Sequence, residues 1–214
     1  MNTPAYRSTE GLRRWLVPML LGAAVIAVVA AVSSLFDMAL WNDAATDAAN
    51  ASPRGLVLAD NRRAALVILQ LLWLVATGVV FMIWFHRLYR NLRPLGAEPT
   101  HSGLVPVGGF LVPIMNLFVP FMVAREVATK TGPDTGTGAV NAWWAVWLFA
   151  GLLGTAVGNV WTAAVLADEI ADALRVLAVY ELVVVAAAVL AVRMVGTLTR
   201  RQEGQAERLG LLQA

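Results

Sequence analysis

Four long apolar runs, separated by short polar segments, dominate this sequence. They cover residues 15–36, 64–85, 143–166 and 176–195. Each run has about the 20 residues that a helix needs to cross the roughly 30 Å hydrocarbon core of a bilayer, at about 1.5 Å per residue. The pattern predicts an all-α integral membrane protein, built as a bundle of four transmembrane helices.

A fifth apolar stretch, residues 104–123, is interrupted by Pro106, Pro113 and Pro120. Proline removes a backbone hydrogen bond from a helix, and the freed carbonyl groups need partners that lipid cannot offer. We therefore expect a proline-rich re-entrant or interfacial segment between the second and third spans, which returns to the side from which it entered.

The basic residues favour the same topology. If residues 104–123 re-enter, twelve of the 16 arginine and lysine residues lie on one side of the membrane, together with both chain ends. If they cross, the division is seven against nine, which shows no bias. Because basic residues collect on the cytoplasmic side, we predict a cytoplasmic tail over residues 1–14, a single membrane domain over residues 15–195 and a cytoplasmic tail over residues 196–214.

Composition narrows the class of protein further. The 214 residues are 59% hydrophobic and only 14% charged, whereas about a quarter of the residues in a soluble domain are charged. Cysteine is absent and only two histidines occur, so disulfides, thiolate chemistry and Cys-rich or His-rich metal clusters are excluded. Lys130 is the only lysine beside many arginines, a bias typical of GC-rich bacterial genomes. We expect a bacterial inner-membrane protein with no cofactor and no nucleic-acid partner.

A basic cluster follows the second apolar run. It consists of His86, Arg87, Arg90 and Arg93. Guanidinium groups at helical spacing could contact the phosphates of anionic lipid headgroups. The alternative, which the sequence favours, is a basic anchor that holds the helix end at the cytoplasmic surface.

Two asparagines lie in or near the proline-rich stretch. Asn116 stands between Pro113 and Pro120, where its amide is expected to donate to the freed backbone carbonyls; lining a small polar cavity is the alternative. Asn91 could cap the turn after the second run or bond to the proline-rich stretch.

Two further polar residues fall within apolar runs. Glu181 is expected to be a protonated or snorkelling glutamate bonded to Tyr180 or Asn159; the alternative is an intramembrane carboxylate that serves in a proton relay or coordinates a cation. Asn159 itself is expected to make hydrogen bonds between helices.

Small residues predict close helix packing. Gly151, Gly154 and Gly158 share one helical face, and such faces let helices approach closely in lipid. Packing within the bundle is favoured over a dimer face. Ala23, Ala27, Ala30 and Ser34 form a matching stripe on the first run.

Two sequence blocks resemble a known family. They are WFHRLYRNLRPLG at residues 84–96 and GGFLVPIMNLFVPFMVAREV at residues 108–127, with WWAVW after them at residues 143–147. Together they resemble the bacterial membrane family named domain of unknown function 4328, over residues 64–195. The resemblance implies a multi-helix membrane protein without an assigned activity. The family positions would be Trp84, Arg87, Asn91, Gly96, Pro113, Asn116, Pro120, Trp143 and Trp144.

No catalytic constellation is found in the sequence, so an enzyme is not expected. The first hypothesis is a non-enzymatic membrane scaffold or interaction subunit, with unknown protein partners and with arginines at the lipid headgroups. The second is a small transporter or channel that uses the Pro113–Asn116–Pro120 segment. A lipid-binding or lipid-processing protein is the third.

Overall fold

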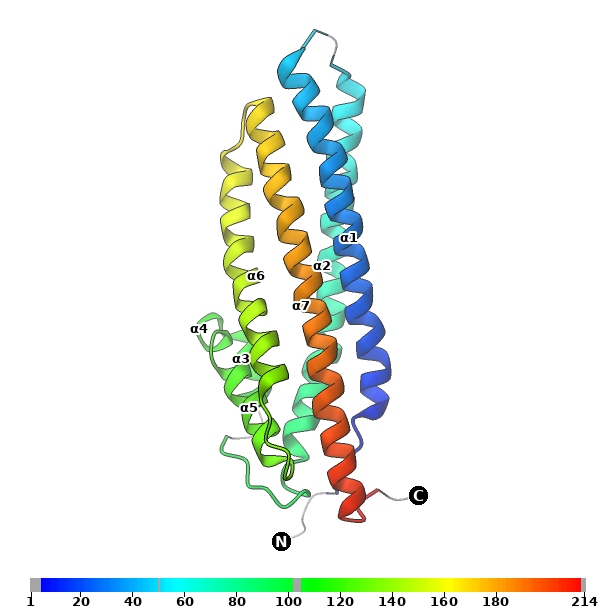
Figure 1. Ribbon diagram of the computed structural model, residues 1–214, viewed down its shortest axis with the longest axis vertical. Coiled ribbons are helices and arrows are strands. Elements are labelled where there is room, and N and C mark those ends of the chain that lie inside the picture. The colour runs from blue at the N-terminus through cyan, green and yellow to red at the C-terminus, as the bar shows by residue number, and fades with distance from the viewer. Residues whose placement is uncertain (1–4, 50, 102–104, 213–214) are drawn as a thin grey trace. The chain divides into compact units, whose positions relative to one another are not determined.

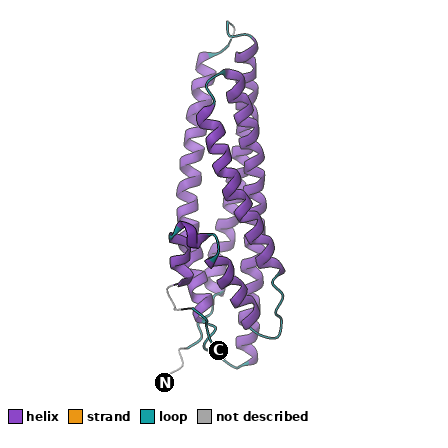
Figure 2. Cartoon of the chain, turned by 90° about the vertical axis from the view of Figure 1, so that its left-hand side faces the viewer, coloured by secondary structure: helices purple, strands orange, loops and turns teal. Residues whose placement is uncertain are grey.

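The computed structural model describes residues 5–49, 51–101 and 105–212 of the chain. This part contains helices and connecting loops, and no strand (Figure 2). The helices are α1 (Glu10–Thr46), α2 (Pro53–Arg90), α3 (Val105–Leu111), α4 (Pro113–Asn116), α5 (Val119–Lys130), α6 (Gly138–Ala163) and α7 (Ala167–Arg208) (Figure 1). The prediction of an all-α protein is confirmed.

Four of these helices are long and apolar enough to cross a membrane: α1, α2, α6 and α7. Each contains one of the predicted runs almost completely, although α6 ends at Ala163, before the predicted limit of residue 166. Helices α1, α2 and α7 extend well beyond their apolar runs. Helix α7, for example, continues to Arg208, so most of the predicted C-terminal tail is helical.

The ends of α2 show why the helix exceeds its apolar run. Pro53 occupies the first helical position, and the Ser52 hydroxyl accepts a hydrogen bond of 3.2 Å from the Gly55 N–H. Both features favour helix initiation. At the other end α2 stops at Arg90 and a turn follows, in which Gly96 has a φ of 84°, a conformation that suits glycine.

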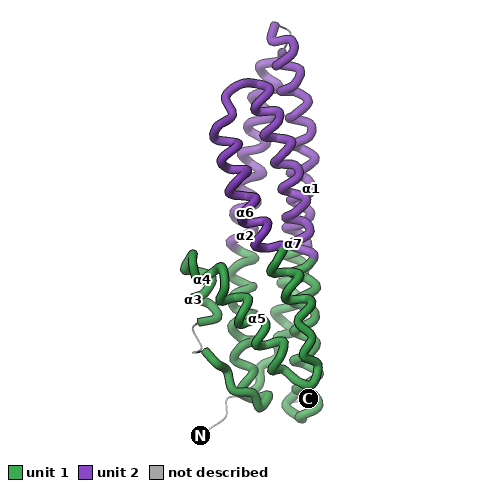
Figure 3. Tube along the Cα trace, turned by 60° about the vertical axis from the view of Figure 1, so that its left-hand side comes forward, with its two compact units in different colours: residues 1–20, 76–145, 190–214 green, residues 21–75, 146–189 purple. Residues whose placement is uncertain are grey.

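The chain forms two compact units (Figure 3). Unit 1 consists of residues 1–20, 76–145 and 190–214, and unit 2 of residues 21–75 and 146–189. Unit 1 therefore contains both chain ends and helices α3, α4 and α5. Unit 2 contains the connection from α1 to α2 and the connection from α6 to α7. Each long helix contributes one part to each unit.

Aromatic side chains fill the core of unit 1. Phe81 of α2 lies 5.4 Å from the Trp84 ring, 5.7 Å from Phe110 of α3 and 5.9 Å from Trp143 of α6, measured between ring centroids. The Trp84 side chain is fully buried, and its Nε1 donates to the Thr199 hydroxyl of α7 at 3.0 Å. These contacts hold the end of α2 between its neighbours.

Helices α3, α4 and α5 form a hairpin that takes up the proline-rich stretch. Helices α3 and α5 pack against each other so closely that a Cβ atom on Gly109 would lie 2.6 Å from the Val119 Cγ1 atom. The turn exposes large apolar side chains, including Leu111, Ile114 and Phe118. The stretch is thus a helical hairpin and not one continuous helix.

The carboxylate of Glu126 connects α5 to the last turn of α2 and to the segment that follows α2. It accepts hydrogen bonds from the Tyr89 hydroxyl at 3.1 Å and from the Thr100 N–H at 2.6 Å, and it pairs with the Lys130 ammonium at 2.8 Å. Burial alone would raise the pKa of the Glu126 carboxyl, but these donors outweigh burial and lower it below its ordinary value.

Unit 2 is held by small-residue contacts and ion pairs. The Trp73 ring of α2 lies against Gly22 of α1, where an added Cβ would come within 2.5 Å of the ring. Arg62 of α2 donates to the Asp37 carboxylate and to the Ser33 hydroxyl of α1. Most of the predicted small stripe of α1 is buried as expected, including Ala27, Ala30 and Ser34.

The predicted glycine face on α6 is only partly present. Gly154 lies against the Tyr180 ring of α7, with an added Cβ at 3.2 Å from it. Gly151 and Gly158 have nothing within 4 Å of an added Cβ and are exposed. The three glycines therefore do not form one packing face among the described residues.

The close packing of the hairpin predicts that position 109 does not tolerate a larger side chain. Replacing Gly109 by Val should destabilise the protein by about 1–3 kcal/mol, because the new side chain overlaps Val119. Gly108→Val is the matched control, since a Cβ at Gly108 meets nothing within 4 Å. Thermal unfolding in detergent measures both variants, and equal unfolding midpoints would contradict the packing seen here.

The lowered pKa of Glu126 predicts a specific acid sensitivity. The pKa of this carboxyl is lower in the folded state than in the unfolded state, where it is 4.5. The ionised carboxylate therefore contributes its full stabilisation at a pH above 4.5. This contribution is lost as the pH falls through the folded-state pKa. Glu126→Gln should therefore lose less stability than the native chain between about pH 6 and about pH 3. Glu207→Gln, at an exposed position, is the control and should lose as much stability as the native chain over this range.

Candidate functional site

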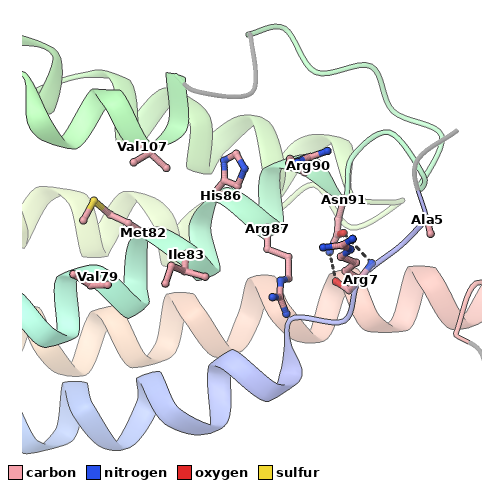
Figure 4. Close-up of a pocket in the computed structure, with 10 residues that line it drawn as sticks. All are labelled: Ala5, Arg7, Val79, Met82, Ile83, His86, Arg87, Arg90, Asn91 and Val107. Atoms are coloured by element: carbon pink, nitrogen blue, oxygen red, sulfur yellow. Dashed lines mark hydrogen bonds between the residues drawn. The ribbon is translucent and has the colours of Figure 1, made fainter. Parts of the chain in front are cut away.

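One stripe of α2 changes from apolar to basic as the helix approaches its end. Its members, spaced by three and four residues, are Val79, Met82, Ile83, His86, Arg87 and Arg90. They line a pocket of about 690 Å³ in unit 1 (Figure 4). Ala5 and Arg7 of the N-terminal segment, Asn91 and Val107 of α3 complete the lining. The pocket therefore has an apolar part and a basic part.

The basic part carries positive charge without a neutralising carboxylate. Arg7, Arg87 and Arg90 form no ion pair within the described ranges. One nitrogen of Arg87 donates to the Ser8 carbonyl at 3.2 Å, which leaves the other guanidinium N–H groups available. The Nδ1 atom of His86 is buried and has no hydrogen-bond partner in the described part of the chain. The free guanidinium N–H groups of these arginines suit an oxyanion.

Asn91 positions Arg7 at this pocket. Its Oδ1 accepts from the Arg7 N–H at 3.2 Å, and its Nδ2 donates to the Arg7 carbonyl at 2.8 Å (Figure 4). The same Nδ2 donates to the Gln202 Oε1 of α7 at 3.2 Å. Asn91 is 3% exposed, so the N-terminal segment is fastened to α2 by a buried amide whose polar atoms are satisfied.

Two residues of α7 complete this arrangement. Gln202 is fully buried, and its Nε2 donates to the Leu88 carbonyl in the last turn of α2 at 2.7 Å. That carbonyl lacks its usual helical partner, because the Leu92 N–H donates to Tyr89 instead. Glu203 accepts from the Ser8 hydroxyl and the Thr9 N–H, both at 2.8 Å. Helix α7 thus caps α2 and holds the start of α1.

The structure brings together only part of the predicted basic cluster. His86, Arg87 and Arg90 do line the pocket. Arg93 does not, because α2 ends at Arg90 and the Arg93 carbonyl accepts from the Gly96 N–H in the following turn. Arg7 takes its place. The predictions for Asn91, a helix cap or a bond to the proline-rich stretch, are replaced by the bonds to Arg7 and Gln202.

The remaining polar predictions change as well. The Oδ1 of Asn116 is buried without a hydrogen-bond partner, and the predicted donation from its amide to backbone carbonyls is not found among the described residues. Glu181 bonds to Gln70 of α2 and not to Tyr180 or Asn159. Asn159 is exposed, its carbonyl accepts from the Thr162 hydroxyl on its own helix, and the predicted bond between helices is not found among the described residues.

Sequence reasoning did not identify Arg7 or Gln202. The spacing of Leu198, Gln202 and Ala206 continues the buried stripe of Met194 and Val195 along α7, and this was the available signal for Gln202. Arg7 precedes the first helix, where no periodicity could place it. Within residues 5–49, 51–101 and 105–212, no group of three or more His, Asp or Glu side chains could hold a metal ion.

The buried amide predicts a measurable coupling between α2 and the N-terminal segment. Asn91→Leu leaves the Arg7 N–H and carbonyl without partners, so we expect a loss of about 1–3 kcal/mol in stability and faster hydrogen exchange at the Arg7 amide. Asn141→Leu is the control, because Asn141 is exposed and bonds only within its own region. Unchanged exchange at Arg7 in Asn91→Leu would contradict the role of this amide.

Comparison with known proteins identifies the family of the chain. A family model described as domain of unknown function (DUF4328) matches residues 47–200. Comparison with curated proteins and with solved structures finds no match. The matched range includes the α2 stripe and Asn91, whereas Arg7 and Gln202 lie outside it. Because the match covers well over half of the 214 residues, the chain belongs to the DUF4328 family.

Proposed function

We propose that this protein is a non-enzymatic scaffold or interaction subunit of the bacterial inner membrane that binds an anionic phospholipid in the α2 pocket. One observation carries the proposal: a single helical stripe lines a pocket and changes from apolar to basic side chains along its length. A phospholipid has the same arrangement along its length, because its apolar acyl chains are followed by a charged phosphate.

The charges of the two units support a cytoplasmic unit 1. Twelve basic and six acidic residues belong to the ranges of unit 1, and four basic and eight acidic residues belong to those of unit 2. Because basic residues are retained on the cytoplasmic side, both chain ends and the connection from α2 to α6 should face the cytoplasm. The inner leaflet, which contains anionic lipids, would then be the source of the ligand.

Different pocket residues would contact different parts of the lipid. The guanidinium groups of Arg7 and Arg90 supply charge-assisted hydrogen bonds to phosphate oxygens. Ile83, which is 48% exposed, and Met82 offer apolar surface to an acyl chain. Arg87 bonds to the Ser8 carbonyl and so also fixes the pocket wall.

The hairpin of α3, α4 and α5 fits a shallow, re-entrant position in the same leaflet. Its turn exposes Leu111, Ile114 and Phe118 by 70%, 75% and 61%, and lipid is the solvent that such side chains favour. A small transporter is the second candidate. The unpartnered, buried Oδ1 of Asn116 at this turn favours it, because a polar atom of that kind could line a path for a solute.

The proposal predicts selective binding of anionic lipid by the purified protein. Native mass spectrometry should show tighter binding of phosphatidylglycerol than of phosphatidylcholine. Arg90→Gln and Arg7→Gln should each weaken phosphatidylglycerol about fivefold, since one arginine near an anionic surface contributes about 1 kcal/mol.

Arg93→Gln is the matched control, because Arg93 has the same charge and does not line the pocket. The proposal is wrong if Arg93→Gln weakens binding as much as Arg90→Gln does, or if both lipids bind equally well.

A further inference from the structure

A buried carboxyl group in unit 2 has a single polar partner among the described residues. Glu181 of α7 is 3% exposed. The Gln70 Nε2 atom of α2 lies 3.0 Å from each of its two oxygens. Both helices are among the four that can cross a membrane. Glu181 lies about 20 Å along α7 from its first residue, at 1.5 Å per residue, and is followed by a continuous apolar run.

No cation neutralises this carboxyl within the described residues of unit 2. Arg62 is paired with Asp37, Arg63 with Asp60 and Arg175 with Asp172. The remaining ionisable groups on the packed helices are Arg54 of α2, Asp43 of α1, and Asp168, Glu169 and Tyr180 of α7; the α6 part, residues 146–163, carries none. A carboxylate without a cation is costly in an apolar environment, unless it binds a proton.

A glutamine is an unusual partner because it can bond to both forms of a carboxyl. When Glu181 is ionised, the Gln70 Nε2–H group donates to the two carboxylate oxygens, each of which lies 3.0 Å from Nε2. When one of these oxygens binds a proton, it becomes a donor. A half-turn of the Gln70 amide then presents Oε1 as the acceptor. A lysine or arginine at this position has no acceptor, so it could not accept from the protonated oxygen.

We propose that Glu181 is an exchangeable proton-binding site inside the membrane-spanning part of the protein, and that Gln70 is its positioning residue. The reaction is the addition of one proton to one carboxylate oxygen, with no other reactant. This site is separate from the lipid pocket, which is lined by different residues.

Infrared spectroscopy of the protein in lipid tests the proposal directly. As the pH is stepped between about 5 and about 9, a carbonyl stretching band of a protonated carboxyl should appear at the acid end and disappear at the alkaline end. Glu181→Gln should remove this band. Glu169→Gln, at an exposed carboxylate on the same helix, should leave it unchanged.

Gln70→Met provides a readout of positioning. It keeps the length of the side chain and removes both its donor and its acceptor. The band should then shift to higher frequency, because the protonated carboxyl loses its hydrogen-bond partner, and should persist to higher pH, because the carboxylate loses its donor. A merely structural Gln70 would change stability without moving the band.

The proposal is overturned if no band differs between the native chain and Glu181→Gln at any pH, since Glu181 would then not change its protonation state. It is also overturned if Gln70→Met leaves both the frequency and the pH dependence of the band unchanged. Neither result would affect phosphatidylglycerol binding, so the outcome is independent of the proposed lipid site.

Discussion

The cost of taking charged groups out of water is the constraint on which the rest of this structure depends. Four apolar helices leave little room for ions, and the charges are placed accordingly. Basic residues concentrate in the ranges of unit 1, and acidic residues outnumber them in unit 2. Where an ionised group is buried it is paired, as Asp37 is with Arg62 and Glu126 with Lys130. Glu181 is the exception among the described residues, and a buried carboxyl without a cation suggests a function.

Neutral amides make the buried polar connections that ions would make at a higher cost. Asn91 fastens the N-terminal segment to α2, Gln202 caps the end of α2 from α7, and Gln70 bonds to Glu181. Each of these amides joins segments that are far apart in the sequence. Two of them, Asn91 and Gln202, also determine where Arg7 and the end of α2 lie, so the shape of the basic pocket depends on uncharged residues that would themselves bind no anion.

The sequence predicted well those features that depend on residues close together in the chain. Apolar length predicted the four long helices, and proline spacing predicted a break in residues 104–123, which the hairpin confirms. Helix ends were less accurate, because caps such as Ser52 lie outside the apolar runs. Side-chain partners failed most often: Gln70, not Tyr180, contacts Glu181, and Arg7, not Arg93, completes the pocket. Both contacts depend on which faces of segments far apart in the chain pack together, and a single sequence does not show this packing directly.

The proposed topology has both chain ends and the connection from α5 to α6 on the cytoplasmic side of the membrane. The chain contains no cysteine, so single cysteines can be introduced and labelled with a membrane-impermeant maleimide. Lys130→Cys, at the end of α5, should react only after the cytoplasmic side is opened, and Ala48→Cys, between α1 and α2, should react in intact cells. Labelling of position 130 from the periplasmic side would contradict the account, because residues 104–123 would then cross the membrane.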